Sequence, residues 1–393
     1  MVDTKDNSEE DLDKNAQEIE KEGIDENAEI LEEPFDATKI NIETKTPSLD
    51  TLIKRLERGT IQMNTETYFQ RQPDLWDKPK QSRLIESLLI RFPLPAFFFD
   101  ATDDESWLVV DGLQRLSSIR NFCVDKKLAL TGLEFLTHLN GMDWEHLPTH
   151  LQRVIEESQV LIYKIMPGTP AKVKFNIFKR VNTGGLTLEP QEIRHALFQG
   201  KPATFIAELA TSKEFLAATD NRIATRRMLD RDFINRFLCF YLIGYENYKP
   251  DLDTFMSEAM QSIYDKPTED IDKIRQDFKK SMNLSIAIFG KKAFRKIYKN
   301  DDKLAPINKS LFDALSVQFA LLDDTERELL EAKKELFQDK IKTALSEQNE
   351  FFIAVTTSTG DRKKVTTRHN FVKNLIQEVI KTENQSENQP ENQ

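Results

Sequence analysis

The chain has 393 residues, 39% of them hydrophobic, and a net charge of −11 at pH 7. This length supplies enough material for one large or two ordinary domains. Only two cysteines occur, Cys123 and Cys239, so the composition excludes a disulfide framework and a zinc site, and both thiols are expected to be buried in helices.

The hydropathy of the chain argues against a membrane protein. No apolar run approaches the roughly eighteen residues that a transmembrane helix needs. The N-terminus also lacks the basic and apolar pattern of a signal peptide. We therefore expect a cytoplasmic protein that has no membrane partner.

The negative charge is concentrated at the N-terminus. Residues 1–36 contain fifteen Asp or Glu and three Lys, a charge of −12, so the remaining 357 residues carry +1. Because the body of the protein is nearly neutral, its charge does not exclude anionic ligands. Residues 1–40 are predicted to be an acidic disordered tail, and residues 382–393, which repeat Glu-Asn-Gln, a polar disordered tail.

The hydrophobic periodicity divides the remaining chain into two domains, at residues 41–200 and 201–381. In the first, helices are predicted from Ser48 and over 80–91 and 171–180, and strands over 96–99, 108–110 and 160–165. In the second, helices are predicted over 228–243, 252–264, 271–284, 309–322, 325–346 and 367–380, with a short strand at 351–355. These patterns predict an α+β fold followed by a mostly helical region.

The segment from Trp107 to Phe122 is the most informative part of the sequence. The apolar run 108–110 predicts a buried strand, Asp111-Gly112 predicts a turn, and a helical pattern follows at once. Polar groups at the carboxyl end of a strand commonly line ligand sites in α/β-type sheets. The segment therefore predicts a strand, a tight turn and a helix that begins beside a binding site.

The polar residues of this helix allow two interpretations. Gln114, Arg115 and Ser118 are expected on or beside its exposed first turns. Free backbone N–H groups, the helix dipole and a guanidinium would together favour an anion. Alternatively, Asp111 and Arg115 pair with each other and cap the helix, an arrangement that has no ligand.

A second polar cluster follows the helix predicted over 171–180. Asn182, Thr183, Gly184 and Gly185 suit a helix C-cap, and they also suit a backbone that approaches a phosphate closely. Pro190 suits the first turn of the next helix. In that helix, Glu192, Arg194 and His195 either cap and pair locally or face a pocket.

Several common catalytic motifs are absent from the sequence. It has no phosphate-binding P-loop, dinucleotide fingerprint, zinc-protease helix or nucleophile elbow. The five histidines form no paired nuclease signature. The chemistry of the chain must therefore be inferred from the polar clusters themselves.

Four motifs, taken in their order, resemble the N-terminal domain family of GmrSD-type modification-dependent restriction enzymes. They are Phe69-Gln-Arg71 with Trp76, the helix and Pro-Leu-Pro at 84–95, the strand–turn–helix at 109–119, and the segment 178–194. The resemblance covers about residues 48–200, and the helix 228–237 resembles the family's helical continuation.

The resemblance implies a ParB/sulfiredoxin-like core whose DGQQR turn binds nucleotide phosphates. Position by position, Asp111, Gln114 and Arg115 become the catalytic residues. The implied nucleotide-binding residues are Gln70, Arg71, Gly112, Arg115, Arg180, Asn182, Thr183, Gly184 and Gly185. A looser similarity to ParB proteins implies Asn182 and Glu192 as Mg²⁺ ligands.

The sequence departs from the family pattern in two places. The DGQQR motif reads Asp-Gly-Leu-Gln-Arg here, so Leu113 replaces an amide side chain, which is expected to affect hydrolysis more than phosphate binding. The second half has no His-rich pattern like that of the HNH nuclease domain found with family members. We therefore expect a separate nuclease subunit as a partner.

The leading hypothesis is an NTP-hydrolysing sensor, with a bound NTP and Mg²⁺, in an anti-phage, modification-dependent restriction system. The alternative is a non-catalytic, ParB-like DNA-binding protein that contacts DNA through basic side chains. These are Arg222, Arg226, Arg227, Arg231, Lys363, Lys364 and Arg368. A third possibility is a DNA endonuclease, which no recognisable cutting centre supports.

Overall fold

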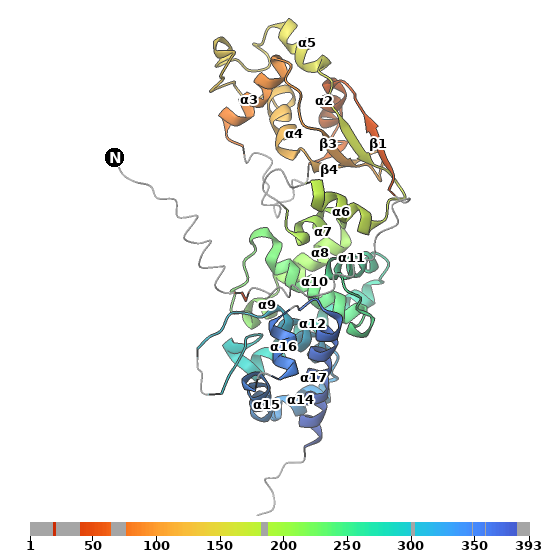
Figure 1. The fold of residues 1–393 in the computed structure, drawn as a ribbon, viewed down its shortest axis with the longest axis vertical. Helices are drawn as coiled ribbons and strands as arrows, with labels where there is room; N and C mark the ends of the chain where they lie inside the picture. Colours follow the sequence, from red (N-terminus) through yellow and green to blue (C-terminus); the bar gives the residue numbers. More distant parts are fainter. Residues whose placement is uncertain are drawn as a thin grey trace, which may run out of the picture. The chain divides into compact units, whose positions relative to one another are not determined.

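The computed structural model describes residues 19–20, 40–63, 76–181, 188–299, 303–347, 349–357 and 359–382. It divides the chain into two units (Figure 1). One is Pro34–Leu197, and the other combines Phe198–Gln393 with Met1–Glu33. Most of both predicted tails, together with Gln70, Arg71 and the segment 182–185, lies outside the described residues.

The first unit is built on a five-stranded mixed sheet in the order β1-β5-β3-β4-β2. The strands are β1 (Ile42–Lys45), β2 (Ile61–Gln62), β3 (Phe97–Asp100), β4 (Trp107–Asp111) and β5 (Ile162–Ile165). In the centre, β3 pairs antiparallel with β4 and parallel with β5. At the edges, β1 is antiparallel to β5 and β2 is parallel to β4. The three central strands were predicted from sequence, whereas the edge strands were not.

The helices of the first unit were predicted from the sequence, except the one at Thr149–Glu157, which was missed. They are α2 (Leu49–Glu57), α3 (Lys78–Leu89), α4 (Leu113–Ile119), α5 (Thr149–Glu157), α6 (Ala171–Val181) and α7 (Pro190–Leu197). A π-helical turn, Arg120–Val124, continues α4. The apolar spacing in α2 shows why these segments fold as helices, because Leu49, Leu52, Ile53 and Leu56 fall on one face and are all buried.

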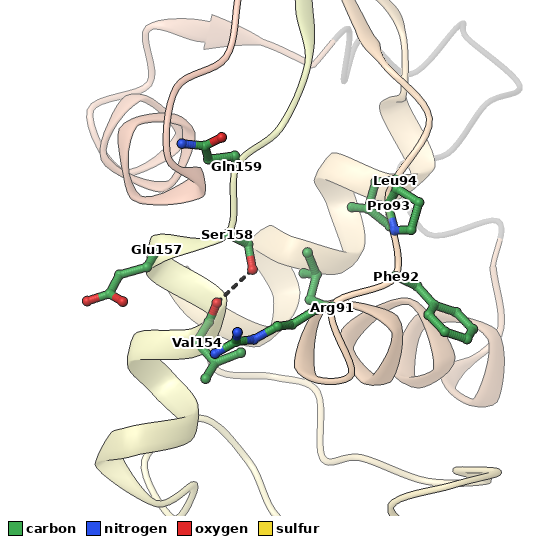
Figure 2. A pocket seen from close by; sticks show the side chains of 9 residues that line it. Arg91, Phe92, Pro93, Leu94, Val154, Glu157, Ser158 and Gln159 are labelled. Atoms are coloured by element: carbon green, nitrogen blue, oxygen red, sulfur yellow. Dashed lines mark hydrogen bonds between the residues drawn. The ribbon is translucent and has the colours of Figure 1, made fainter.

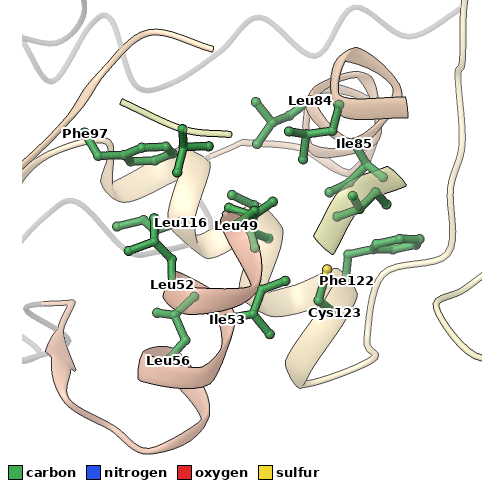
Figure 3. Packing of buried hydrophobic residues seen from close by; sticks show 14 of the residues in the cluster. Leu49, Leu52, Ile53, Leu56, Leu84, Ile85, Phe97, Leu116, Phe122 and Cys123 are labelled. Atoms are coloured by element: carbon green, nitrogen blue, oxygen red, sulfur yellow. The ribbon is translucent and has the colours of Figure 1, made fainter. Parts of the chain in front are cut away.

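The core of this unit lies where α2, α3 and α4 meet the sheet (Figure 3). Phe97 from β3 and Leu116 from α4 are both fully buried there. Cys123, in the π-helical turn, is also buried, and burial raises the pKa of its thiol. Its predicted role as a core side chain is confirmed, as is that of Cys239 in the second unit.

The described secondary structure of the second unit is helical apart from isolated β-bridges, among them those of Ile19, Arg295 and Ile307. It contains α8 (Lys201–Ala210), α9 (Lys213–Ala218), α10 (Leu229–Leu242), α11 (Leu252–Ile263), α12 (Thr268–Phe289), α13 (Lys309–Ala320), α14 (Asp324–Ala332), α15 (Lys334–Ser346), α16 (Glu350–Thr356) and α17 (Arg362–Lys381). The central element is α13, buried from Ser310 to Ala320 because α10, α12 and α17 pack around it. None of the described helices is both long and apolar enough to cross a membrane.

Two sequence predictions for this unit were wrong. The segment 351–355, predicted as a strand, lies in α16, where Asn349 caps the helix and Phe351, Ala354 and Val355 share its buried face. The helix predicted over 325–346 is two helices that break at Lys333. A short apolar run fits either kind of element, and here the cap and the neighbouring helices decide.

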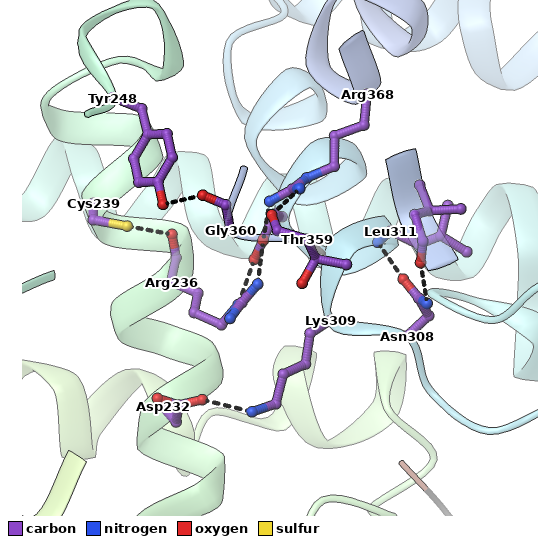
Figure 4. Close-up of polar contacts among 12 residues, drawn as sticks. Asp232, Arg236, Cys239, Tyr248, Asn308, Lys309, Leu311, Thr359, Gly360 and Arg368 are labelled. Carbon is purple, nitrogen blue, oxygen red and sulfur yellow. Dashed lines mark hydrogen bonds and ion pairs between the residues drawn. The ribbon is translucent and has the colours of Figure 1, made fainter. Parts of the chain in front are cut away.

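A buried ion-pair cluster crosslinks three parts of the helical unit (Figure 4). Asp313 on α13 accepts two hydrogen bonds from Arg236 on α10, at 2.9 and 2.7 Å, and one from Arg368 on α17, at 3.0 Å. All three side chains are almost completely buried. Removing one partner of such a pair typically costs about 3–5 kcal/mol, because the other charge remains in the interior.

Candidate functional site

The Asp111-Gly112 turn connects β4 directly to α4. Gly112 has φ +99°, a left-handed conformation that residues with a Cβ rarely adopt. A Cβ at this position would lie 2.5 Å from Cδ1 of Phe97, so the ring fills the space that any side chain would need. Both the backbone conformation and the packing therefore require glycine here.

Arg115 lies inside the turn and not on its surface. Its Nη2 contacts Asp111 at 2.8 Å and the carbonyl oxygen of Ala96 at 3.1 Å, and Nη1 donates to the carbonyl oxygen of Pro95. The guanidinium also stacks over Phe97, 4.6 Å from the ring centroid. Arg115 therefore holds the segment before β3 against the turn after β4.

The predicted exposure of these residues was wrong for two of three. Arg115 and Ser118 are buried, and Ser118 donates to the carbonyl oxygen of Gln114 at 2.8 Å. Burial lowers the pKa of the Arg115 guanidinium, whereas Asp111 acts in the opposite direction. The Asp111–Arg115 pair, one of the two interpretations of the sequence, is thus present.

The turn also joins the first and the third of the four family motifs. The backbone N–H of Trp76 donates to Oε1 of Gln114 at 3.3 Å, and the carbonyl oxygen of Trp76 accepts from Gln81 on α3 at 2.7 Å. Leu113, in contrast, is buried in the apolar core. The departure from the family motif therefore supplies core packing at a position where the family has an amide.

The described residues of the fourth motif lie mostly at the end of α6 and on α7. Glu192 is buried and accepts from the backbone N–H of Glu189 at 2.7 Å, which caps α7. Arg194 donates to Gln191 at 2.8 Å. These two residues cap and pair locally, as one sequence interpretation expected. Arg180 is exposed in the last turn of α6.

A polar cluster that sequence reasoning missed lies at the carboxyl end of β3. Asp100 contacts Nζ of Lys174 on α6 at 2.8 Å, and Thr102 donates to Asp100 from both its backbone and its hydroxyl. Because β3 and β4 are antiparallel, the carboxyl end of β3, where this cluster lies, is at the opposite end of the strand pair from Asp111. A carboxylate directly after the apolar run Phe97–Phe99 was the available signal.

A cavity of about 450 Å³ lies beside the segment that Arg115 holds (Figure 2). Its walls come from the end of α3, the segment 92–94 and the end of α5. In Figure 2 the side chain of Arg91 extends across it toward Val154, whereas Phe92 points away. Arg91 has φ +60°, so a non-glycine residue occupies a left-handed position at the cavity rim.

The basic residues proposed to contact DNA are divided by burial. Arg231 and Arg368 are buried, so the prediction that they contact DNA phosphates was wrong for the conformation described. Arg222, Arg226 and Lys363 are exposed, and Arg222 pairs with Asp220 at 3.3 Å. Within the described part of the chain, no group of three or more His, Cys, Asp or Glu is placed to hold a metal ion.

Comparison with known families gives a match to the first part of the chain. Residues 49–199 match the family model described as the GmrSD restriction endonuclease, N-terminal domain. This part of the chain resembles that domain. The match spans α2 through α7, so it includes the whole Asp111–Arg115 turn. Neither the curated proteins nor the solved structures searched give a match.

The GmrSD_N match confirms the resemblance that the four motifs predicted. The α+β first unit and the helical second unit are also confirmed. The ParB/sulfiredoxin-like assignment stays a prediction, as do the domain boundaries at 41–200 and 201–381. The roles predicted for Asp111, Gln114 and Arg115 are taken up as proposals below.

Proposed function

We propose that the chain is a nucleotide-responsive regulatory component of a GmrSD-type, DNA-targeted restriction system that acts in the cytoplasm. The observation that carries the proposal is the joining of two family motifs through Trp76 and Gln114, inside the segment that matches GmrSD_N. The proposed ligand is an NTP with Mg²⁺, and the proposed partners are modified DNA and a separate nuclease subunit.

The geometry assigns different tasks to the residues of the turn. Arg115 donates hydrogen bonds to Asp111, Pro95 and Ala96, so its role in the proposal is to position the turn and the segment before β3. Gln114, at the first turn of α4, and Asp111 are proposed to orient the attacking water, because phosphoryl transfer depends on charge stabilisation and a positioned nucleophile.

The residues proposed to contact phosphate and metal come from motifs before and after the Asp111–Arg115 turn in the sequence, and from the turn itself. Gln70, Arg71, Gly112 and Arg180 are proposed to bind the phosphates together with Asn182, Thr183, Gly184 and Gly185. Asn182 and Glu192 are proposed to hold Mg²⁺ through oxygen atoms, the ligands that this ion prefers. Since Glu192 caps α7, metal binding would compete with its hydrogen bond to Glu189.

A thermal-shift screen with ATP, GTP, CTP and UTP, with and without Mg²⁺, tests the proposal. A ligand that binds only the native state increases the free energy of unfolding, by about 2.7 kcal/mol at a hundred times its Kd, and so raises the melting temperature. We expect one nucleotide to stabilise the wild type in a Mg²⁺-dependent way, and Arg71→Ala to remove the shift.

The control variant is Lys126→Ala, which removes an exposed cation paired with Glu145. It should keep the nucleotide-dependent shift. Hydrolysis is measured separately by phosphate release, and Gln114→Ala should reduce it more than it reduces binding. Absence of a shift with all four nucleotides would refute the proposal.

A further inference from the structure

Two residues of the acidic N-terminal segment are docked on the helical unit. Ile19 forms a parallel β-bridge with Ile307, and the backbone N–H of Glu20 donates to the carbonyl oxygen of Ile307 at 2.9 Å. Ile307 is fully buried and also bridges to Arg295 on its other side. The segment is thus added as a third short strand beside two pieces of chain from the second unit.

The carboxylate of Glu20 enters a polar site formed by Lys296 and Asn308. Lys296 forms an ion pair with Oε1, and Nδ2 of Asn308 donates to Oε2 at 3.0 Å. The Lys296 side chain is only 9% exposed, and Glu20 is its one ion-pair partner among the described residues. A buried ammonium without a counter-ion is costly, so this lysine needs a carboxylate from outside its own segment.

Contacts within the helical unit hold the two receptor side chains in place. Oδ1 of Asn308 accepts from the backbone N–H of Leu311 at 2.8 Å, as the N-cap of α13. Its Nδ2 also donates to the carbonyl oxygen of Val355 at 2.7 Å (Figure 4). Nζ of Lys296 lies 5.4 Å from the ring centroid of Phe352. With Asn308 fixed by α13 and α16, one of its N–H groups remains directed at the Glu20 carboxylate.

We propose that Lys296, Asn308 and Ile307 form a receptor for a short apolar–acidic chain segment, and that Ile19–Glu20 occupies it in the same chain. The backbone pairing selects an extended segment, and the ion pair selects a carboxylate at the second position. Charge complementarity supports this occupant, since the N-terminal 36 residues carry −12. The inference is independent of the nucleotide proposal.

Docking changes how the acidic segment is attached. Residues 21–36, with seven Asp or Glu and one Lys, carry −6. They are joined at one end to Glu20, docked on the helical unit, and at the other to β1 of the sheet unit through the chain. The docked pair therefore places one end of this acidic stretch on the helical unit.

Hydrogen–deuterium exchange on the full-length chain tests the docking. Glu20→Gln removes the charge and keeps the size of the side chain, so the backbone N–H groups of Glu20 and its neighbours should exchange about tenfold faster or more. Lys296→Met, which keeps an apolar stem beside Phe352, should give the same result. The matched control is Glu22→Gln, the same charge change two residues further along, and it should leave exchange at Glu20 unchanged.

A labelled synthetic peptide of residues 14–25 tests the receptor in trans by fluorescence polarisation. It should bind the full-length Glu20→Gln chain saturably, and bind the wild type at least about tenfold more weakly, because the tethered segment has a high effective concentration. The same peptide with Gln in place of Glu20 should not bind. Unchanged exchange in both Glu20→Gln and Lys296→Met, or equal peptide binding by wild type and Glu20→Gln, would overturn the proposal.

Discussion

The ring of Phe97 occupies the space that a side chain at Gly112 would need. A Cβ at position 112 would lie 2.5 Å from Cδ1 of Phe97. The turn of the DGLQR motif is therefore defined by its packing as well as by its backbone. The same ring supports the guanidinium of Arg115. A substitution at any of these three residues should therefore alter the packing of the other two.

Gly112→Ala should destabilise the protein by about 2–4 kcal/mol in urea unfolding. A left-handed conformation costs a residue with a Cβ about 1–2 kcal/mol, and displacement of Phe97 adds to it. The matched control is Gly141→Ala, where φ is +91° and no atom lies within 4 Å of the new Cβ. Equal losses for the two variants would show that the Phe97 contact contributes nothing.

Glu86→Gln should loosen the segment 134–136 and lower stability by about 2–3 kcal/mol. The buried carboxylate on α3 accepts from the backbone N–H groups of Glu134, Phe135 and Leu136 at 3.0, 2.7 and 2.7 Å. Glutamine replaces one acceptor with a donor that faces an N–H group. Faster hydrogen exchange at these three amides is the measurement, and the exposed Glu157→Gln serves as control.

The same carboxylate should make stability depend on acidity. Burial raises the pKa of Glu86, but the three backbone N–H groups outweigh it, so the net direction is below the ordinary value of 4.5. The unfolded chain then binds the proton first, and this contribution is complete above pH 4.5 and is lost as the pH falls through the folded pKa. Wild type and Glu86→Gln should converge in stability at low pH, and a constant difference would contradict this assignment.

Acidification should also lower stability through His369, in a less acidic pH range than through Glu86. It is fully buried, stacked on Tyr245 with ring centroids 4.6 Å apart, and burial holds its pKa well below 6.5. Because the unfolded chain takes up the proton first, stability is full above about pH 6.5 and declines as the pH falls below it. His369→Phe keeps an aromatic ring and should flatten the pH dependence between about pH 5 and 7. The exposed His138→Gln should leave the slope as in wild type.

Arg91→Gly should stabilise the protein by about 0.5–1 kcal/mol. Phe92 donates to the carbonyl oxygen of Ser87 and Arg91 to that of Leu88, the two hydrogen bonds of a Schellman cap, in which glycine is the usual left-handed residue. Arg91→Ala removes the same side chain but keeps the unfavourable φ. A gain in melting temperature for both variants would show that the side chain, and not the backbone, is the source.

The sequence predicted those parts of the fold that local periodicity determines. The strands around 97–100 and 162–165 and the helix over 171–180 lie close to their predicted positions. Both edge strands were missed. Each is only two to four residues long and owes its conformation to pairing with a neighbour far away in the chain.

In the candidate site, too, local features could be predicted from the sequence and features that depend on distant parts of the chain could not. The strand–turn–helix and the pairing of Asp111 with Arg115 could be read from the sequence, because both are local. The carbonyl groups of Pro95 and Ala96 and the buried state of Arg115 could not, since they depend on how β3 returns beside β4. Glu86 was overlooked among the apolar residues of its helix, although a lone acid on such a face was a signal of backbone contacts.

The docking of Ile19–Glu20 also fixes the order in which the protein can be completed during synthesis. Domains generally fold as units as they leave the ribosome, the N-terminal ones first. Residues 34–197 emerge in full before Lys296 and Asn308 are made, so the sheet unit can fold while the N-terminal segment still lacks its receptor. Ile19 and Glu20 are therefore among the last residues of the chain to reach their final place.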